Sequence, residues 1–369
     1  MDNTMKMKVA STILALGAAG ALVLSGCSSS DRGGDSDKTS DAKGFAQDSV
    51  IGVALPQKTS ENWVLAQNLF EDGLKSAGYK PIVQFANSGV SEQQNQIQAM
   101  VEKGAKVIVV GAIDGSQLGN QLKAAADQGV KVIAYDRLLL NTDAVDIYEA
   151  FDNFKVGELQ GQALLDGLKA RKGGGPYNIE LISGSPDDAN SKPFFEGAMS
   201  VLNPKIKDGT LKVVSGQTTQ QQTATQGWKP ENAQNRMDTI LSANYKDKDL
   251  DGVLSPNDTL ARAALTSAKQ AGKPVPVITG QDSEVESVKS IMAGVQYSTI
   301  YKDTRELVKA SIDAVNAYQK GDEPTVTDTK SYNNGVKVVP ANLLKPIIVT
   351  KDNAAEVYAN DSTLAPLTK

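Results

Sequence analysis

The chain contains no histidine and a single cysteine, Cys27, in 369 residues. A lone cysteine cannot form an intrachain disulfide, and it leaves the folded part of the chain without thiol chemistry. The absence of histidine removes the most common general base, the most frequent transition-metal ligand and any Ser-His-Asp triad. Carboxylates or lysines would have to carry any catalysis. These absences favour a binding protein over an enzyme, and we expect neither a cofactor nor a metal.

The chain also lacks an excess of positive charge. It has 38 Lys and Arg residues against 43 Asp and Glu residues, which gives a formal net charge of −5. Proteins that bind nucleic acids use clustered basic residues to neutralise phosphates. The acidic composition therefore predicts no nucleic-acid partner.

Aromatic residues make up only 5% of the chain, which makes their positions informative. Trp63 and Trp228 are the only tryptophans, and each follows a polar loop. An aromatic ring can cover the apolar C–H face of a sugar ring and fix its orientation. Phe194 and Phe195 are further candidates for such contacts, although packing in the core explains Phe195 equally well.

Residues 1–26 are predicted to be a lipoprotein signal peptide. Lys6 and Lys8 precede an uncharged apolar stretch at 9–24, and small residues then lead to Cys27. In this interpretation Cys27 becomes the lipidated first residue of the mature chain. A retained membrane helix is the alternative, but the stretch is shorter than the ~20 residues of a bilayer span. The polar residues 27–48 are predicted to form a flexible tether.

Short β-branched runs alternate with longer segments of helical spacing in the rest of the chain. This alternation predicts an α/β fold with parallel sheets covered by helices. The predicted strands cover 50–55, 81–86, 107–112, 130–135, 178–183, 212–216, 251–255, 275–280 and 297–301. The predicted helices cover 63–77, 91–103, 116–128, 155–170, 232–243, 260–271 and 304–318. So many strands exceed one compact sheet, and we predict two doubly wound, Rossmann-like lobes.

Polar side chains gather where the predicted strands end. In open parallel sheets, ligands bind beyond the carboxyl ends of the strands. The residues predicted to face one crevice between the lobes are Asp136, Arg137, Asn190, Asn257, Asp282 and Lys302. Taken singly, Asp114, Asp258 and Asp303 are better explained as helix caps or turn residues. The convergent set contains both signs of charge with donors and acceptors, which suits a neutral polyhydroxylated ligand.

In the stretch VIAYDRLLL at 132–140, two adjacent charged residues, Asp136 and Arg137, follow an apolar predicted strand. Burying charges costs several kcal/mol per ion unless they are matched. We expect Asp136 and Arg137 to hold each other in the empty crevice and to be matched by ligand hydroxyls when it closes. A lone salt bridge between the lobes is the alternative.

One acidic cluster imitates a calcium-binding loop. Asp247, Asp249 and Asp251 have the spacing of the first ligands of such a loop, and its twelfth position falls on Asp258. However, Asp replaces the usual bidentate Glu, Pro256 interrupts the second half, and 251–255 is better explained as a strand. Calcium binding is therefore not the favoured interpretation.

Several stretches, taken in order, resemble one protein family. They are VIAYDR, FDNFKVGELQG, GSPDDAN, GAMSVL, GWKPENA, SPND, GQD, IYKDTREL and NNGVKVVPANLLKPI. Together they resemble the periplasmic-type sugar-binding proteins of ABC importers, in the D-xylose-binding and multiple-monosaccharide-binding group. The similarity runs from about residue 50 to 358 and covers nearly all of the folded chain.

The resemblance implies a type I periplasmic binding protein, with two lobes joined by a three-stranded hinge and closing on one sugar. We assign 49–152 plus 284–330 to the N-terminal lobe and 153–283 plus 331–369 to the C-terminal lobe. The family's sugar contacts fall on Trp63, Asp136, Arg137, Asn190, Phe194, Trp228, Asn257, Asp282 and Lys302.

Two positions depart from the pattern of the relatives. Asn62 stands where relatives carry Arg, which removes donors and opens space for a ketose or a differently substituted sugar. Xylose-specific relatives have Arg at the position of Phe195, so this residue favours the multiple-sugar branch. Asn62 is included among the expected ligand-binding residues.

The sequence thus predicts an extracytoplasmic, lipid-anchored, monomeric receptor that captures a pentose or hexose and delivers it to an ABC permease. A sensor that presents sugar to a membrane signalling receptor is the first alternative. A glycosidase using Asp136 and Asp282 is the second, but Arg137 and Lys302 beside them are expected to keep both carboxylates ionised. A repressor core is disfavoured because the chain has an export signal and no DNA-binding headpiece.

Overall fold

The computed structural model describes residues 44–58 and 60–369. The predicted signal peptide, Cys27 and most of the predicted tether lie outside these residues. Within them, no helix combines the length and the apolar character needed to cross a bilayer.

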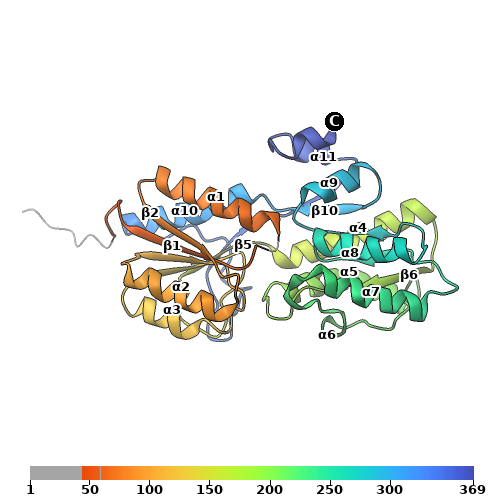
Figure 1. Ribbon diagram of the computed structural model, residues 1–369, viewed down its shortest axis with the longest axis horizontal. Coiled ribbons are helices and arrows are strands. Elements are labelled where there is room, and N and C mark those ends of the chain that lie inside the picture. The colour runs from red at the N-terminus through yellow and green to blue at the C-terminus, as the bar shows by residue number, and fades with distance from the viewer. Residues whose placement is uncertain (1–43, 59) are drawn as a thin grey trace, which may run out of the picture. The chain divides into compact units, whose positions relative to one another are not determined.

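The first lobe is a parallel sheet of order β11-β5-β4-β3-β1-β2. Its strands are β1 (Val50–Leu55), β2 (Lys80–Phe85), β3 (Val107–Val110), β4 (Lys131–Tyr135), β5 (Ile147–Phe151) and β11 (Ala341–Leu344). In Figure 1, α1 (Glu61–Ser76) and α10 (Thr304–Lys320) lie above this sheet, and α2 (Val90–Glu102) and α3 (Gly119–Ala126) lie below it.

Both faces of this sheet are buried, which explains why its central strands are continuous apolar runs. Val53 of β1 packs with Phe70 of α1 in the core on one face. Ile108 of β3 packs with Met100 of α2 in the core on the other. Parallel sheets covered on both sides require such two-sided strands.

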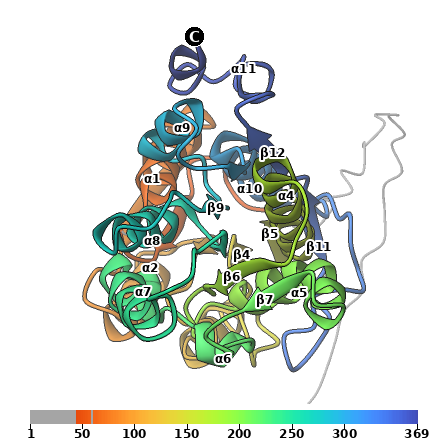
Figure 2. The same ribbon diagram turned by 90° about the vertical axis from the view of Figure 1, so that its right-hand side faces the viewer.

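The second lobe has a smaller parallel sheet of order β7-β6-β8-β9. Its strands are β6 (Tyr177–Leu181), β7 (Leu211–Val213), β8 (Gly252–Leu254) and β9 (Val277–Ile278). Figure 2 shows α4 (Asn153–Lys172) and α5 (Ser191–Lys207) on one side of these strands, with α7 (Pro230–Asn244) and α8 (Asp258–Gln270) on the other. The short helices α6 (Gln220–Thr223) and η1 (Gln226–Trp228) follow β7.

The C-terminal part of the chain adds an antiparallel pair of strands, β10 (Ser298–Tyr301) and β12 (Ile347–Thr350). Helix α9 (Val285–Met292) precedes this pair, and α11 (Ala354–Val357) and η2 (Ala365–Thr368) follow it. The chain passes between the lobes between β5 and α4, between β10 and α10, and between β11 and β12. These passages confirm the predicted two-lobed α/β fold with a three-segment hinge.

The structure differs from the expected lobe assignment in the C-terminal third of the chain. Helix α9 packs on α8, and β10 packs on α4, so this part of 284–330 lies with the second lobe. Strand β11, which we had assigned to the second lobe, pairs with β5 of the first. The hydrogen-bonding partner of a strand decides its lobe, and that partner is distant in sequence.

Several elements were not predicted: β5, β11, β12, α5, α9 and the short helices. In β5 the apolar run is interrupted by Glu149, which is buried and accepts a hydrogen bond from Asn342 Nδ2 at 2.9 Å. The cross-strand amide satisfies one oxygen of the carboxyl group, and this allows an acidic residue inside a buried strand.

Candidate functional site

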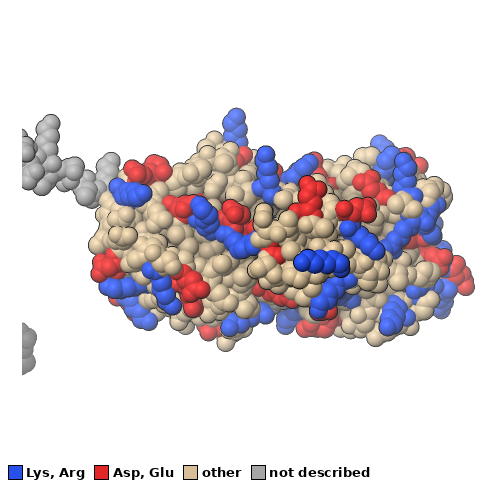
Figure 3. Space-filling view, turned by 90° about the horizontal axis from the view of Figure 1, so that it is seen from above, with Lys and Arg blue, Asp and Glu red and all other residues tan. Residues whose placement is uncertain are grey.

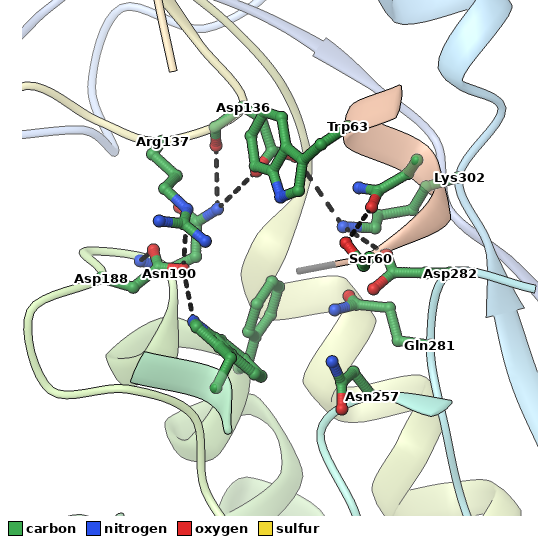
Figure 4. A pocket seen from close by; sticks show the side chains of 13 residues that line it. Ser60, Trp63, Asp136, Arg137, Asp188, Asn190, Asn257, Gln281, Asp282 and Lys302 are labelled. Atoms are coloured by element: carbon green, nitrogen blue, oxygen red, sulfur yellow. Dashed lines mark hydrogen bonds and ion pairs between the residues drawn. The ribbon is translucent and has the colours of Figure 1, made fainter. Parts of the chain in front are cut away.

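All of the predicted ligand-binding side chains line one cavity between the two lobes (Figure 4). Ser60, Asp188 and Gln281 line it as well, although nothing in the sequence had marked them as candidates. The space not filled by protein atoms is about 440 Å³, including its open side. Clefts between domains are a common location of small-molecule sites.

The cavity lies at the carboxyl ends of the parallel strands. Asn62 and Trp63 follow β1, and Asp136 and Arg137 follow β4. In the first sheet β1 lies between β2 and β3, so the chain moves to one side of β1 for β2 and then crosses to the other side for β3. Crevices form at such a reversal because the loops diverge there.

The second lobe supplies its side chains in the same way. Asn190 lies in the loop between β6 and α5, Trp228 lies in η1, and Asn257 lies between β8 and α8 as the N-cap of α8. Asp282 follows β9, and Lys302 follows β10 on the segment that returns to the first lobe.

Arg137 does not pair with Asp136, which corrects the expectation that the two adjacent charges hold each other. Its Nε lies 3.0 Å from Asp188 Oδ2, and its Nη1 donates to Ala112 O at 2.9 Å. Asp136 has a positive φ of 60°, so neighbouring side chains leave the backbone in different directions. The partner of Arg137 is therefore Asp188 of the second lobe.

Asp188 also orients Trp228. Trp228 Nε1 donates to Asp188 Oδ2 at 3.0 Å, and the backbone N–H of Asn190 donates to Asp188 Oδ1 at 2.9 Å. Burial raises the pKa of Asp188, and the Arg137 guanidinium opposes this shift. One carboxylate thus fixes a cation and an aromatic ring of the same cavity.

Both tryptophan rings lie against glycines. A Cβ atom at Gly184 would overlap the ring of Trp228, and one at Gly111 would lie 3.0 Å from the ring of Trp63. The guanidinium carbon of Arg137 lies 5.3 Å from the centroid of the Trp63 ring, within the range of a cation–π contact. The sequence identified the two tryptophans as candidates, but not the two glycines whose missing side chains leave room for the rings.

Asp136 and Asn190 also connect the two lobes. Asn190 Nδ2 donates to Asp136 O at 2.8 Å, and Tyr148 Oη donates to the same oxygen at 2.7 Å. Asn153 Nδ2 donates to Asn190 Oδ1 at 2.9 Å and so fixes the orientation of that amide. Asn190 is thereby held in place by backbone and side chains from both lobes.

Lys302 lies between two carboxylates. Its Nζ is 3.2 Å from Asp282 Oδ1 and 3.8 Å from Asp136 Oδ1. Burial opposes the charge on Lys302, but the two carboxylates outweigh it and raise the pKa of the ammonium group. Burial raises the pKa of Asp282, and Lys302 opposes this shift. The ammonium group also lies 5.6 Å from the centroid of the Phe194 ring.

The uncharged polar side chains of the cavity differ in how many of their donors and acceptors already form hydrogen bonds within the protein. Asn257 Oδ1 accepts the backbone N–H of Leu260 and caps α8, so its Nδ2 is the group left for a ligand. Gln281 is 2% exposed, and its Oε1 has no hydrogen-bond partner among the described residues. Ser60 Oγ donates to Asn62 Oδ1. Gln281 therefore offers an acceptor for a ligand hydroxyl.

The remaining candidates from the sequence lie outside this cavity. Phe195 is buried in the core of the second lobe. Asp303 caps α10, and Asp114 accepts hydrogen bonds in a turn. Asp258 begins α8 and is buried, with its carboxylate accepting from Gln296 and Thr299. Among residues 44–58 and 60–369, no cluster of three or more His, Cys, Asp or Glu side chains could hold a metal ion.

Comparisons with known proteins agree with this architecture. A model of the periplasmic binding protein domain matches residues 51–323. The multiple sugar-binding periplasmic receptor ChvE of Rhizobium radiobacter is 50% identical over 322 residues, which cover 86% of this chain and 91% of that protein. The D-xylose-binding periplasmic protein of Escherichia coli is 37% identical over 317 residues, which cover 86% of this chain and 91% of that protein.

A solved structure is similar over the same region. An ABC transporter solute-binding protein from Clostridium phytofermentans with bound β-D-glucose has a TM-score of 0.83 and 38% identity, and the match covers 87% of this chain and 100% of that chain. These relatives are binding and receptor proteins. The chain is thus a member of the periplasmic binding protein family, in the type I group that contains the multiple sugar-binding and D-xylose-binding proteins of ABC transporters.

Proposed function

We propose that the protein captures an uncharged monosaccharide in the interlobe cavity and delivers it to an ABC permease outside the cytoplasm. The observation that carries this proposal is the composition of the cavity wall. Two tryptophans, paired charges and amides from both lobes surround a single space. Such a wall matches the two chemical faces of a sugar, apolar C–H groups and hydroxyls.

Each sugar hydroxyl needs a donor and an acceptor. Asp136, Asp282 and Gln281 supply acceptors, and Arg137 and Lys302 supply donors. Hydrogen bonds to charged groups contribute about 1.5 to 3 kcal/mol each, and an unpaired buried polar group costs about 1 to 3 kcal/mol. A sugar that lacks one matching hydroxyl would therefore bind considerably more weakly.

The charges of the cavity favour a neutral ligand. Asp136, Asp188 and Asp282 outnumber Arg137 and Lys302, and the contacts already pair each cation with carboxylates. An added carboxylate on the ligand would meet negative charge in a buried site. We therefore expect a parent hexose to bind more tightly than the corresponding sugar acid.

We infer the sugar preference by analogy with the relatives. The chain is more similar to the multiple sugar-binding receptor than to the D-xylose-binding protein, and a similar structure holds β-D-glucose. We infer a site that accepts several pentoses and hexoses. Asn62, shorter than the Arg expected at this position, supports a broad preference because it leaves more space.

Closure on the sugar would act by population shift. The cavity takes side chains from both lobes, so a sugar makes its full set of contacts only when the lobes are together. A micromolar dissociation constant requires about 8 kcal/mol of net binding free energy. Several hydrogen bonds to charged groups and contacts with two aromatic rings are sufficient in size.

We also propose that the chain is exported, lipidated on Cys27 and held near the membrane by residues 27–48, as a monomer. Lys, Arg, Asp and Glu side chains are interspersed on the face of the molecule shown in Figure 3. Labelling cells with an alkyne fatty acid tests the anchor. The full-length protein should be labelled and Cys27→Ser should not.

A sensor is the second candidate function, because one relative at 50% identity is called a receptor. Permease reconstitution separates the two. Sugar uptake into proteoliposomes that requires this protein supports delivery, whereas binding without uptake favours a sensor. Release of aryl alcohol from an aryl glycoside would instead indicate an enzyme.

Calorimetry with a panel of pentoses, hexoses, ketoses and sugar acids tests the binding function. Asp282 has a positive φ of 91°, and Asn tolerates this conformation better than most residues, so Asp282→Asn keeps the shape of the site. The loss of one charge-assisted hydrogen bond predicts about 10- to 150-fold weaker binding. Unchanged affinity would show that the sugar lies elsewhere.

A further inference from the structure

The segment that carries Asp282 is conformationally strained. Asp282 and Ser283 both have positive φ values, 91° and 51°, which non-glycine residues rarely adopt. The backbone N–H of Asp282 donates to Ile300 O at 2.9 Å, and that of Ser283 donates to Thr299 Oγ1 at 3.2 Å. Strained residues persist only where surrounding contacts hold them in place.

This segment is not supported by a packed core on both sides. Asn62, Asp282 and Lys302 line the sugar cavity and also a second cavity, which the C-terminal residues 361–364 help to enclose. The second cavity contains about 840 Å³ of space not filled by protein atoms, including its open side. Support for the Asp282–Ser283 turn on this side must therefore come from specific contacts.

The C-terminal segment supplies such a contact. Tyr358, directly after α11, is fully buried, and its hydroxyl donates to Ser283 Oγ at 2.7 Å. Its ring packs edge-to-face on Tyr301, with the centroids 5.2 Å apart. Tyr301 in turn donates to Asp361 Oδ2 at 2.9 Å, so the segment is fixed at two points beside the hinge. Figure 2 shows α11 above α9 and β12.

We propose that Tyr358 is a positioning residue for ligand binding, and that its hydroxyl holds the Asp282–Ser283 turn in the conformation that presents Asp282 to the sugar. This inference rests on the proposed sugar-binding function. Tyr358 does not line the sugar cavity. It acts through Ser283, and residues outside the cavity thereby set the affinity of a contact inside it.

Calorimetry on Tyr358→Phe tests the inference, with Tyr245→Phe as a matched control. Tyr245 is also fully buried, and its hydroxyl donates to Glu180 Oε1 at 2.8 Å in the core of the second lobe. Both variants lose one hydroxyl hydrogen bond and should melt at a lower temperature. We expect about 3- to 10-fold weaker sugar binding for Tyr358→Phe and wild-type binding for Tyr245→Phe.

A double-mutant cycle distinguishes positioning from general loosening of the fold. If Tyr358 acts through Asp282, Tyr358→Phe should change the affinity by less than about twofold in the Asp282→Asn background. Ser283→Ala removes the same hydrogen bond from the other side and should weaken binding as Tyr358→Phe does. An equal loss in the wild-type and Asp282→Asn backgrounds would overturn the inference.

The outcomes also separate this inference from the proposed function. Wild-type protein that binds no monosaccharide in the panel would overturn both. Wild-type protein that binds sugar while Tyr358→Phe binds equally tightly would overturn the positioning by Tyr358 alone.

Discussion

The contact between Gly184 and Trp228 gives a sharp test of the proposed cavity wall. A Cβ atom at Gly184 would overlap two ring carbons of Trp228 and also Ser191 Oγ. Gly184→Ala therefore has no room for its methyl group unless the indole moves. Overpacking of this kind costs about 1 to 3 kcal/mol of stability.

The indole can move only toward the cavity or by breaking its hydrogen bond to Asp188, which is 3.0 Å long. Either displacement removes the flat surface proposed to cover the sugar and loosens the carboxylate that faces Arg137. Loss of an aromatic contact and of one hydrogen bond to a charged group amounts to about 2 to 3 kcal/mol. We expect sugar binding to weaken by about 30- to 150-fold.

Calorimetry measures the sugar affinity of three glycine variants whose added methyl groups should perturb the tryptophan rings to different degrees. Gly111→Ala places a methyl group 3.0 Å from the Trp63 ring, so it should weaken binding less than Gly184→Ala does. Gly174→Ala meets no atom within 4 Å and serves as the control, with wild-type affinity. Wild-type affinity for Gly184→Ala, or a larger effect of Gly111→Ala, would refute the assigned position of Trp228.

Three further substitutions test other parts of the structure. Asp188→Asn removes the charge that faces Arg137 and leaves one oxygen for two donors, Trp228 Nε1 and the backbone N–H of Asn190, and calorimetry should show binding weakened by about 10-fold or more. Burial raises the pKa of Glu149 from 4.5 to about 8, so the folded state retains a proton and stability falls as pH rises from about 4.5 to 8. Urea denaturation should show this fall in the wild type and its loss in Glu149→Gln. In Asp258→Asn, an NH₂ group replaces one buried oxygen that accepts from Gln296 or Thr299, so a donor would face a donor. Urea denaturation should show that the free energy of unfolding falls by about 1 to 3 kcal/mol.

The sequence predicted which side chains line the cavity because their position after each strand follows from the fold. A side chain directly after a parallel strand lies at the carboxyl edge of the sheet, whichever strand it follows. Asp136, Asn257 and Asp282 were found in this way, and the structure brings them to one cavity. The ends of the apolar runs in the sequence were sufficient to locate these residues.

The sequence alone could not show which side chain of a loop faces the cavity. The loop after β6 contains Asp187, Asp188 and Asn190, and sequence alone does not distinguish a carboxylate directed at Arg137 from one directed at Ser185. Gln281 was missed for a similar reason, since its neighbour Asp282 has the more conspicuous side chain. The orientation of each side chain depends on backbone angles, including the positive φ of Asp282.

The lobe assignment was wrong where strands cross the hinge. A chain that leaves one lobe has no local signal for its next partner, because these strand pairings join residues far apart in sequence. Ala341 of β11 pairs with Tyr148 of β5, and Ser298 of β10 pairs with Thr350 of β12. Pairings of this kind depend on tertiary packing more than on the composition of the strand itself.

The charge pairs of the cavity bear directly on how a neutral sugar could control closure. Arg137 meets Asp188 across the lobes, and Lys302 on the hinge meets Asp136 of the first lobe. Separation of the lobes would return these groups to water, so closure must meet a desolvation cost that roughly offsets the attraction within each pair. The pairs therefore fix the register of the two lobes while contributing little to the balance between open and closed forms. Contacts that a sugar makes with both lobes at once are then large enough to decide that balance, although each is worth only a few kcal/mol.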